Sequence, residues 1–223
     1  MLSFIAKHPP RSKICHLNVI TLDGGRSVAH FNPSGGQKYL VTNRLPPALS
    51  PAEAQRQGLP HPGANTSLAP PLHRHFWQDE SFHIISGTAK FTVGGSRREV
   101  RLASGGEVVV IPKREAHTFC NASEEADLVI EFALRPANKR TDEAYFRNIW
   151  GYRNDLKQAG MQRSIFQSLL FMHRGGVVLA LPGPEILSKV AGLLLNYIGG
   201  VLIGRFLLGF QDTYSDYYHE RSS

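Results

Sequence analysis

At 223 residues, of which 42% are hydrophobic, the chain can bury one core with appendages and does not depend on disulfide bonds for stability. It has two cysteines, Cys15 and Cys120, and the apolar stretch at its start is too short for a signal peptide, so we expect a reduced, cytoplasmic protein. The formal net charge is +7, but the densest basic cluster, Arg97, Arg98 and Arg101, has no interleaved aromatic residues, which argues against a nucleic-acid partner.

Short β-rich segments, separated by turn signals, dominate the first two thirds of the chain. The predicted strands are residues 15–21, 38–43, 81–85, 88–93, 98–102, 107–111 and 127–134. Segments 88–93 and 98–102 alternate around a short Gly-Gly-Ser turn, which predicts a β-hairpin. Many short strands with turn signals between them are typical of a β-sandwich or a β-barrel.

Residues 46–71 contain seven of the fourteen prolines and are predicted to form an irregular loop. Ser50, Pro51 and Glu53 match a capping box with proline at the first helical position, so one or two helical turns are expected before Gly58. A loop of this length inside a compact domain is often functional or disordered. Two interpretations stay open, a lid over the barrel mouth, which we slightly favour, and a solvated insertion without a role in catalysis.

Two runs of residues with fixed spacing follow this loop. The first contains His73, His75, Glu80 and Gly87, and the second contains Gly106, Pro112, His117 and Asn121. Successive side chains of a strand point to opposite faces, so His73 and His75 share a face and can bind one ion. Glu80 adds an anionic oxygen and His117 adds a third imidazole. Such a mixed set of ligands suits Fe, Mn, Ni, Cu or Zn.

Both runs resemble the two signature motifs of the cupin superfamily, over about residues 73–121. The resemblance implies a single-domain, RmlC-like jelly-roll barrel, that is, a double-stranded β-helix, in a mainly β protein. It also implies that a divalent transition metal is bound by His73, His75, Glu80 and His117. One position departs from the motif, because Arg114 stands where the family usually has glycine. A side chain fits there only if the turn avoids a positive φ, so the geometry of this turn is left open.

Strand alternation predicts which residues lie beside the metal. Phe82 and Ile84 share the parity of Glu80, and Phe119 shares the parity of His117, so all three are expected to face inward. They are candidates for the substrate pocket, although plain core packing is an equally good explanation in a small barrel. His83 has the opposite parity and is expected on the outside.

The candidate catalytic residues are Glu80 and Glu131. Glu80 acts through its place among the predicted ligands. Glu131 is the only candidate for a general base, provided that its strand turns it inward. The alternative, which we favour, is that Glu131 is a solvated strand residue.

After Pro136 the apolar residues recur at helical spacing, which divides the chain into a barrel domain, residues 1–136, and a C-terminal helical extension, residues 137–223. The first helix is predicted from a cap at Thr141 to Gly160, with a second from Ser164 to Gly175. The face of the first helix that is predicted to pack on the barrel consists of Tyr145, Ile149, Tyr152 and Leu156. The following run, residues 177–184, is predicted to break regular structure.

The last predicted helix, residues 190–210, has only Asn196 and Arg205 as strongly polar residues. Between Lys189 and Arg205 lie fifteen residues, fewer than the roughly twenty that span a bilayer, although Arg205 can snorkel and lengthen the span. A helix that is apolar on all sides must be buried somewhere. Packing on protein, including a homodimer, is favoured over membrane association.

Three imidazoles and one carboxylate leave one or two coordination positions of an ion open, which is typical of a catalytic metal site. With the resemblance, this favours an enzyme acting on a small aromatic or polyketide-like molecule, most plausibly a dioxygenase or oxidase. Two other classes stay open. One is a non-redox isomerase, cyclase or decarboxylase in which the ion acts as a Lewis acid, and the other is a metal- or small-molecule-binding protein without turnover.

Overall fold

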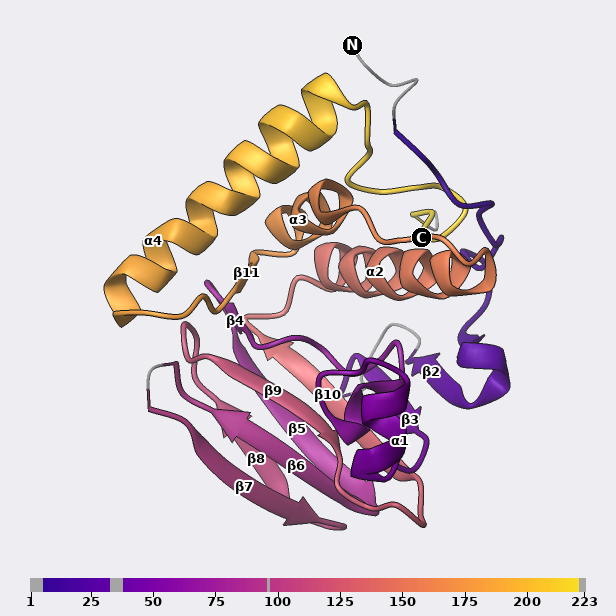
Figure 1. Ribbon diagram of the computed structural model, residues 1–223, viewed down its shortest axis with the longest axis vertical. Coiled ribbons are helices and arrows are strands. Elements are labelled where there is room, and N and C mark those ends of the chain that lie inside the picture. Colours follow the sequence, from indigo (N-terminus) through magenta and orange to yellow (C-terminus); the bar gives the residue numbers. More distant parts are fainter. Residues whose placement is uncertain (1–5, 33–37, 96, 221–223) are drawn as a thin grey trace.

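The computed structural model describes residues 6–32, 38–95 and 97–220. Two antiparallel sheets pack as a jelly roll, and a layer of helices lies at one end of them (Figure 1). The six-stranded sheet has the order β1 (Val19–Leu22), β2 (Ser27–Phe31), β3 (Val41–Leu45), β10 (Leu128–Arg135), β5 (Asp79–Ser86) and β8 (Val108–Ile111). The five-stranded sheet has the order β11 (Val177–Leu179), β4 (His73–His75), β9 (His117–Asn121), β6 (Thr88–Val93) and β7 (Glu99–Ser104). The predicted mainly β jelly roll with a C-terminal helical extension is confirmed.

The inward faces of the strands form an aromatic core. Phe82 is fully buried at its centre, with its ring centroid 5.2 Å from that of Phe91, 5.1 Å from Phe119 and 5.8 Å from Phe132. Edge-to-face and tilted ring pairs of this kind stabilise a core beyond the apolar area that they bury. The core therefore forms a rigid support below the predicted ligands.

The predicted hairpin is confirmed, since β6 and β7 pair from Thr88 with Ser104 to Val93 with Glu99. Ser96 of its predicted turn lies outside the described residues. Two predicted strands begin later than expected, since residues 15–21 were predicted for β1 and residues 38–43 for β3. Two other strands lie where no strand was predicted. The sequence analysis missed β2, although its buried and more exposed residues alternate as they should on a strand. It was wrong about residues 177–184, because β11 forms there by pairing with β4.

The proline-rich loop contains the short helix α1 (Pro51–Arg56) where the capping box predicts it. The Ser50 hydroxyl accepts a hydrogen bond from the Glu53 backbone N–H at 3.3 Å. Gly58 follows the helix with a φ of 65°, a conformation that glycine adopts without strain. A single turn of η3 (Pro62–Asn65) follows, and the loop then runs into β4.

Helices α2 (Lys139–Gln158) and α3 (Ile165–Arg174) cover one end of the barrel (Figure 1). The predicted cap of α2 was wrong by three residues, because the Asn138 side chain accepts a hydrogen bond from the Thr141 N–H. The deepest contact of α2 with the barrel is made by Phe146 and Trp150, which belong to the barrel core. Of the face predicted to pack there, Tyr145 and Ile149 lie at the edge of that core, while Tyr152 and Leu156 belong to a second cluster beyond the barrel.

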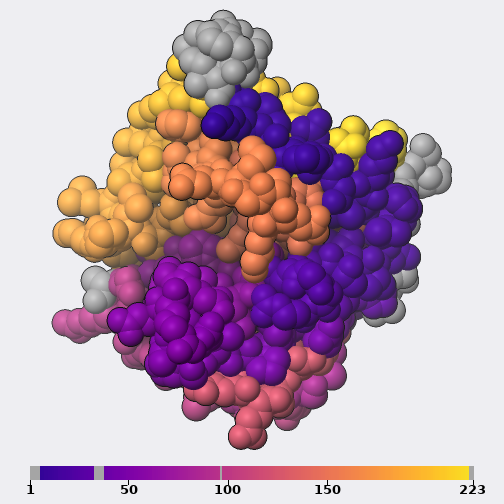
Figure 2. Space-filling view, turned by 45° about the vertical axis from the view of Figure 1, so that its right-hand side comes forward, coloured from indigo at the N-terminus to yellow at the C-terminus, as the bar shows by residue number. Residues whose placement is uncertain are grey.

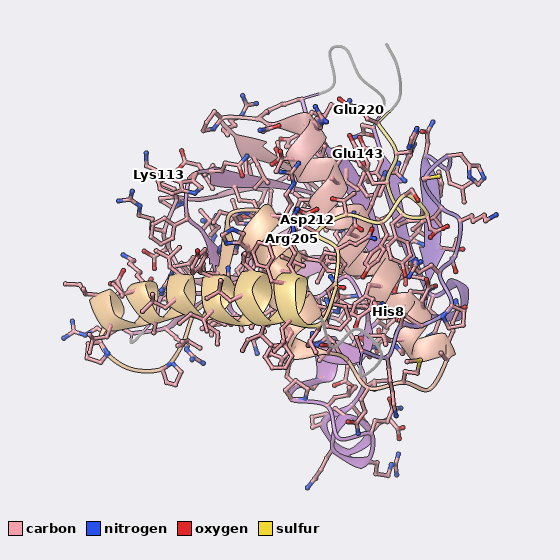
Figure 3. All side chains as sticks on the ribbon, turned by 90° about the horizontal axis from the view of Figure 1, so that it is seen from above. His8, Lys113, Glu143, Arg205, Asp212 and Glu220 are labelled. Atoms are coloured by element: carbon pink, nitrogen blue, oxygen red, sulfur yellow. The ribbon has the colours of Figure 1, made fainter. Side chains whose placement is uncertain are left out.

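Helix α4 (Glu185–Leu195) continues as the π-helical segment η4 (Asn196–Leu207), so the last helix begins and ends earlier than predicted. It packs on α3 through glycines, and the Asn196 side chain donates a hydrogen bond to the Val177 carbonyl at 2.6 Å. Figure 3 shows this helix from above, with Arg205 near the end of the helix and beside Asp212. Nη1 of Arg205 lies 3.3 Å from Oδ2 of Asp212.

The side of this helix away from α3 is apolar and exposed, as shown by Ile186 at 76% and Phe206 at 63% of their accessible surface. By length and composition alone, the 23 residues of Glu185–Leu207 would suffice to cross a membrane. Contact with a second copy of the chain and contact with lipid both stay predictions for this side.

Residues 137–223 also supply β11 to the five-stranded sheet, directly beside β4. The extension therefore contributes a strand to the barrel as well as helices around it. The division into residues 1–136 and 137–223 stays a prediction.

Asp23 lies buried in the short turn η2 (Asp23–Gly25), and its carboxylate binds the neighbouring Ser27 and two distant segments of the chain. Its carboxylate accepts hydrogen bonds from the Ser27 hydroxyl at 2.7 Å, from the Ser67 backbone N–H at 2.8 Å and from Lys157 Nζ at 2.8 Å. Burial by itself would raise the pKa of Asp23, but the hydrogen bonds, above all from Lys157 and Ser67, outweigh it and lower the pKa to about 2.

We expect Asp23→Asn to lower the free energy of unfolding by about 2 kcal/mol at pH 7, because the carboxyl pKa falls on folding and each unit is equivalent to about 1.4 kcal/mol. A pKa lowered by folding stabilises the protein above the unfolded value of 3.8 and loses that contribution as the pH falls through about 2. Urea denaturation of both proteins should therefore show a difference in unfolding free energy that shrinks as the pH falls from 3.8 to about 2. Asparagine is a suitable replacement because it tolerates the φ of 57°. If the difference in unfolding free energy does not change with pH, the ionised Asp23 carboxylate is not the stabilising group.

Candidate metal centre and its chamber

The four predicted ligands converge inside the barrel. His73 and His75 lie on β4, Glu80 on β5 and His117 on β9, where His117 pairs directly with His73. All four side chains are buried, and one donor atom from each lies within 4.8 Å of the others. The predicted convergence is therefore confirmed, and it follows from strand alternation together with the pairing of β4 and β9.

Backbone carbonyls orient two of the imidazoles. His73 Nδ1 lies 2.9 Å from the Pro71 carbonyl oxygen, and His117 Nδ1 lies 3.2 Å from that of Glu115. A carbonyl oxygen can only accept, so each Nδ1 carries the proton. In the neutral rings the Nε2 lone pairs are then free to bind an ion, an arrangement typical of metal-binding histidines.

The remaining close contacts bring two imidazoles against the Glu80 carboxylate. Nε2 of His117 lies 2.8 Å from Oε2 of Glu80, and Nε2 of His75 lies 3.2 Å from the same oxygen. Neither ring nitrogen of His75 has a hydrogen-bond partner among the described residues, although the side chain is buried. An unpaired buried group of this kind costs about 1–3 kcal/mol. A shared cation would satisfy one ring nitrogen of His75 together with His117 Nε2 and the Glu80 carboxylate, so the residues fit a bound metal.

The charges of the cluster also suit metal binding. Burial would raise the pKa of Glu80, but His75 and His117 outweigh it and hold the pKa of this carboxyl well below its usual range. Burial lowers the pKa of His73, and the neighbouring His117 and His75 lower it further. Glu80 is thus a carboxylate and His73 a neutral imidazole, which are the forms that bind metal ions.

His73 and Glu80 open into a chamber of about 240 Å³. The barrel contributes Phe119, α2 contributes Phe146 and Trp150, and α3 contributes Leu169 and Met172. Leu68, Pro70 and Pro71 of the proline-rich loop complete part of the wall. The loop thus borders the chamber, and its role as a lid stays a prediction.

The three residues proposed for the pocket all face inward, but only Phe119 lines the chamber. Phe82 packs behind the ligands, with its ring centroid 6.2 Å from that of His117. Ile84 lies deeper, in the barrel core. For Phe82 and Ile84 the explanation as core packing is therefore correct, because the helices, which the strand pattern does not describe, form the other wall of the chamber.

Glu131 does not reach the candidate metal centre, so its proposed role as general base is wrong. On β10 it pairs with His83 of β5, on the face opposite to Phe132 and Ile130. Its carboxylate lies 2.8 Å from His83 Nδ1. His83 is accordingly outside, as predicted, and the two side chains form a partly exposed pair.

Arg114 resolves the question left by the motif. It adopts a φ of 68°, so the turn keeps its positive φ with a side chain in place of glycine, and the requirement that it avoid one was wrong. The Arg114 N–H donates to the His75 carbonyl at 2.7 Å, and its guanidinium lies 5.3 Å from the centre of the Phe76 ring. These contacts offset part of the strain and fix the end of β4.

Four polar residues of the chamber were not predicted as site residues, namely Tyr145, Arg153, Arg163 and Ser168. Burial raises the pKa of the Tyr145 hydroxyl, while Arg153 lowers it and Glu80 raises it to smaller extents. The charges of Arg153 and Glu80 therefore both act on the Tyr145 hydroxyl. The missed signal was the spacing of Tyr145, Ile149 and Arg153 at four-residue intervals, which places an arginine on the buried face of α2.

The chain is similar to cupin-domain proteins and to proteins that are named oxidoreductases. A family model described as "Cupin domain" matches residues 60–132. The chain is 31% identical to the probable oxidoreductase virH of Hypocrea virens over 162 residues, which cover 70% of this chain and 71% of virH. It is 33% identical to the oxidoreductase iacF of Pestalotiopsis fici over 146 residues, which cover 63% of this chain and 69% of iacF. The cupin domain of Drosophila melanogaster CENP-C aligns with a TM-score of 0.38 and 11% identity, over 60% of this chain and 89% of that domain.

Proposed function

Because the chain belongs to the cupin superfamily, we propose that it is a metal-dependent oxidoreductase that acts on a small, largely apolar organic molecule. The observation that carries this proposal is the buried cluster of three histidines and a glutamate at the wall of an apolar chamber. The oxidoreductase names of virH and iacF support the reaction class. An aromatic or polyketide-like substrate and a dioxygenase or oxidase reaction are the finer form of the proposal.

The residues of the chain have separable roles in this proposal. His73, His75, Glu80 and His117 would hold a divalent transition metal. A redox-active ion there would supply open coordination positions and electron transfer. The rings of Phe146 and Trp150 exclude water and bind the apolar body of the substrate. Tyr145 stays protonated at neutral pH, because burial raises its pKa, and so it can donate a hydrogen bond to a substrate oxygen.

Elemental analysis of the purified protein, followed by oxygen-uptake measurements with a series of hydroxylated aromatic compounds, tests the proposal. We expect iron, copper, nickel or manganese at about one ion per chain, and oxygen consumption with at least one compound. Zinc without oxygen consumption would replace the proposal by the isomerase, cyclase or decarboxylase class, in which the ion polarises a carbonyl. The absence of any bound metal after reconstitution would favour a binding protein.

A further inference from the structure

Arg153 lies where the chamber adjoins a second cavity. This outer cavity has a volume of about 230 Å³ and is lined by the proline-rich loop at Ala64, Thr66 and Ser67 and by the end of α2 and the residues after it. Arg153 and Arg163 line both cavities, whereas the predicted ligands His73 and Glu80 line only the inner one. Figure 2 shows the face on which the purple loop and the orange helical segments come together. The two arginines therefore stand between the outside and the metal centre.

The guanidinium of Arg153 is held in place by backbone atoms. It donates hydrogen bonds to the Ser67 carbonyl at 2.8 Å and to the Ala69 carbonyl at 3.3 Å. Burial, and to a smaller extent Arg163, lowers the pKa of Arg153 to about 10, so it remains a cation at neutral pH. The side chain is thus positioned by backbone carbonyls of the loop.

No carboxylate of the described residues lies within 4.0 Å of either guanidinium as an ion-pair partner. The nearby Lys157 differs, because its Nζ is 2.8 Å from Asp23. Arg153 is partly buried, and an arginine that is removed from water is normally paired with an anion. An arginine is also the side chain best suited to bind a carboxylate through two parallel hydrogen bonds.

We propose that Arg153, assisted by Arg163, binds the anionic oxygen group of the substrate, and that the metal centre therefore acts on apolar organic acids. This inference rests on the proposed function and names its substrate class, which is a carboxylate or an ionised enol or phenol on an apolar body. The anionic group lies at Arg153, and the apolar body fills the chamber toward His73 and Glu80. A volume of about 240 Å³ is slightly below the roughly 300 to 1,000 Å³ of sites for drug-sized ligands, so the body is one ring or two small fused rings.

The test compares two probes of similar shape by titration calorimetry on metal-free protein. Naphthalene-2-carboxylate carries the anionic group and naphthalene-2-carboxamide is neutral. We expect the wild-type protein to bind the carboxylate at least about tenfold more tightly. Arg153→Gln should weaken carboxylate binding by roughly 10- to 100-fold, because a charge-assisted hydrogen bond is lost, with little change for the amide.

Two further variants separate the roles of the nearby cations. Arg163→Gln should weaken carboxylate binding by roughly two- to fivefold, since an exposed guanidinium is screened by solvent. Lys157→Gln is the matched control, because Lys157 lines the outer cavity but its charge is taken up by Asp23. It should leave the affinity for the carboxylate unchanged.

Equal affinities for the two probes in the wild-type protein would overturn the inference, as would a carboxylate preference that survives Arg153→Gln. A preference that appears only after metal is added, and is absent in His75→Ala, would also overturn it, because the carboxylate would then bind the ion. If Arg153→Gln does not fold, the inference is still tested by the two probe affinities of the wild-type protein and by the carboxylate affinity of Arg163→Gln. Since the probes are measured without metal, a failure of metal binding or oxygen uptake refutes the proposed function and leaves this result standing.

Discussion

His75→Ala should leave the purified protein with less than about a tenth of the metal bound by the wild type, and any oxidoreductase activity should fall with it. The variant removes one of four donors and leaves the Glu80 carboxylate and two imidazoles with a poorly compensated ion. Loss of groups that only support a ligand already weakens metal binding about 10- to 100-fold, so the loss of a ligand should weaken it more. Elemental analysis of both proteins, purified side by side, measures the effect.

His83→Ala is the matched control for this experiment. His83 lies on β5 in the same sheet as Glu80, but on the outer face, where it contacts Glu131. We expect its removal to leave the metal content unchanged. Thermal melting of the metal-free proteins should show that His75→Ala still folds, because the aromatic core of the barrel does not depend on the ligands. Full metal occupancy in His75→Ala would refute the assignment of the site.

Gly200→Ala should lower the free energy of unfolding by about 1–3 kcal/mol, although alanine is the better helix former by about 1 kcal/mol. A Cβ at position 200 would lie 2.7 Å from the Leu170 backbone nitrogen and 2.8 Å from the Leu169 carbonyl carbon. Backbone atoms inside α3 cannot move aside as a flexible side chain can, so the two helices must separate. Urea denaturation followed by far-ultraviolet circular dichroism measures the change.

The opposite exchange, Ala191→Gly, serves as the control because Ala191 is on the exposed side of α4. This exchange changes helix propensity alone and should lower the free energy of unfolding by about 1 kcal/mol. The sign of the Gly200→Ala effect therefore separates close packing from propensity. A more stable Gly200→Ala protein would show that the last helix does not pack on α3 in solution.

The sequence predicted the barrel and the four candidate metal ligands through two runs of spaced residues that resemble the cupin motifs. His73 and His75 are two residues apart, so strand geometry alone places them on one face. The hairpin of β6 and β7 follows from two alternating runs and the turn between them. The same parity correctly placed His83 outside and Phe119 inside.

The chamber and its charges were decided only by the tertiary structure. Strand β11 becomes a strand by pairing with β4, and its three residues carry too weak a pattern to predict alone. Glu131 could be placed only once its register with His83 was known. Arg153 meets His73 in one cavity because α2 packs across the barrel mouth. Sequence periodicity describes which face of an element is buried, whereas the partner of that face is set by packing between residues far apart in the chain.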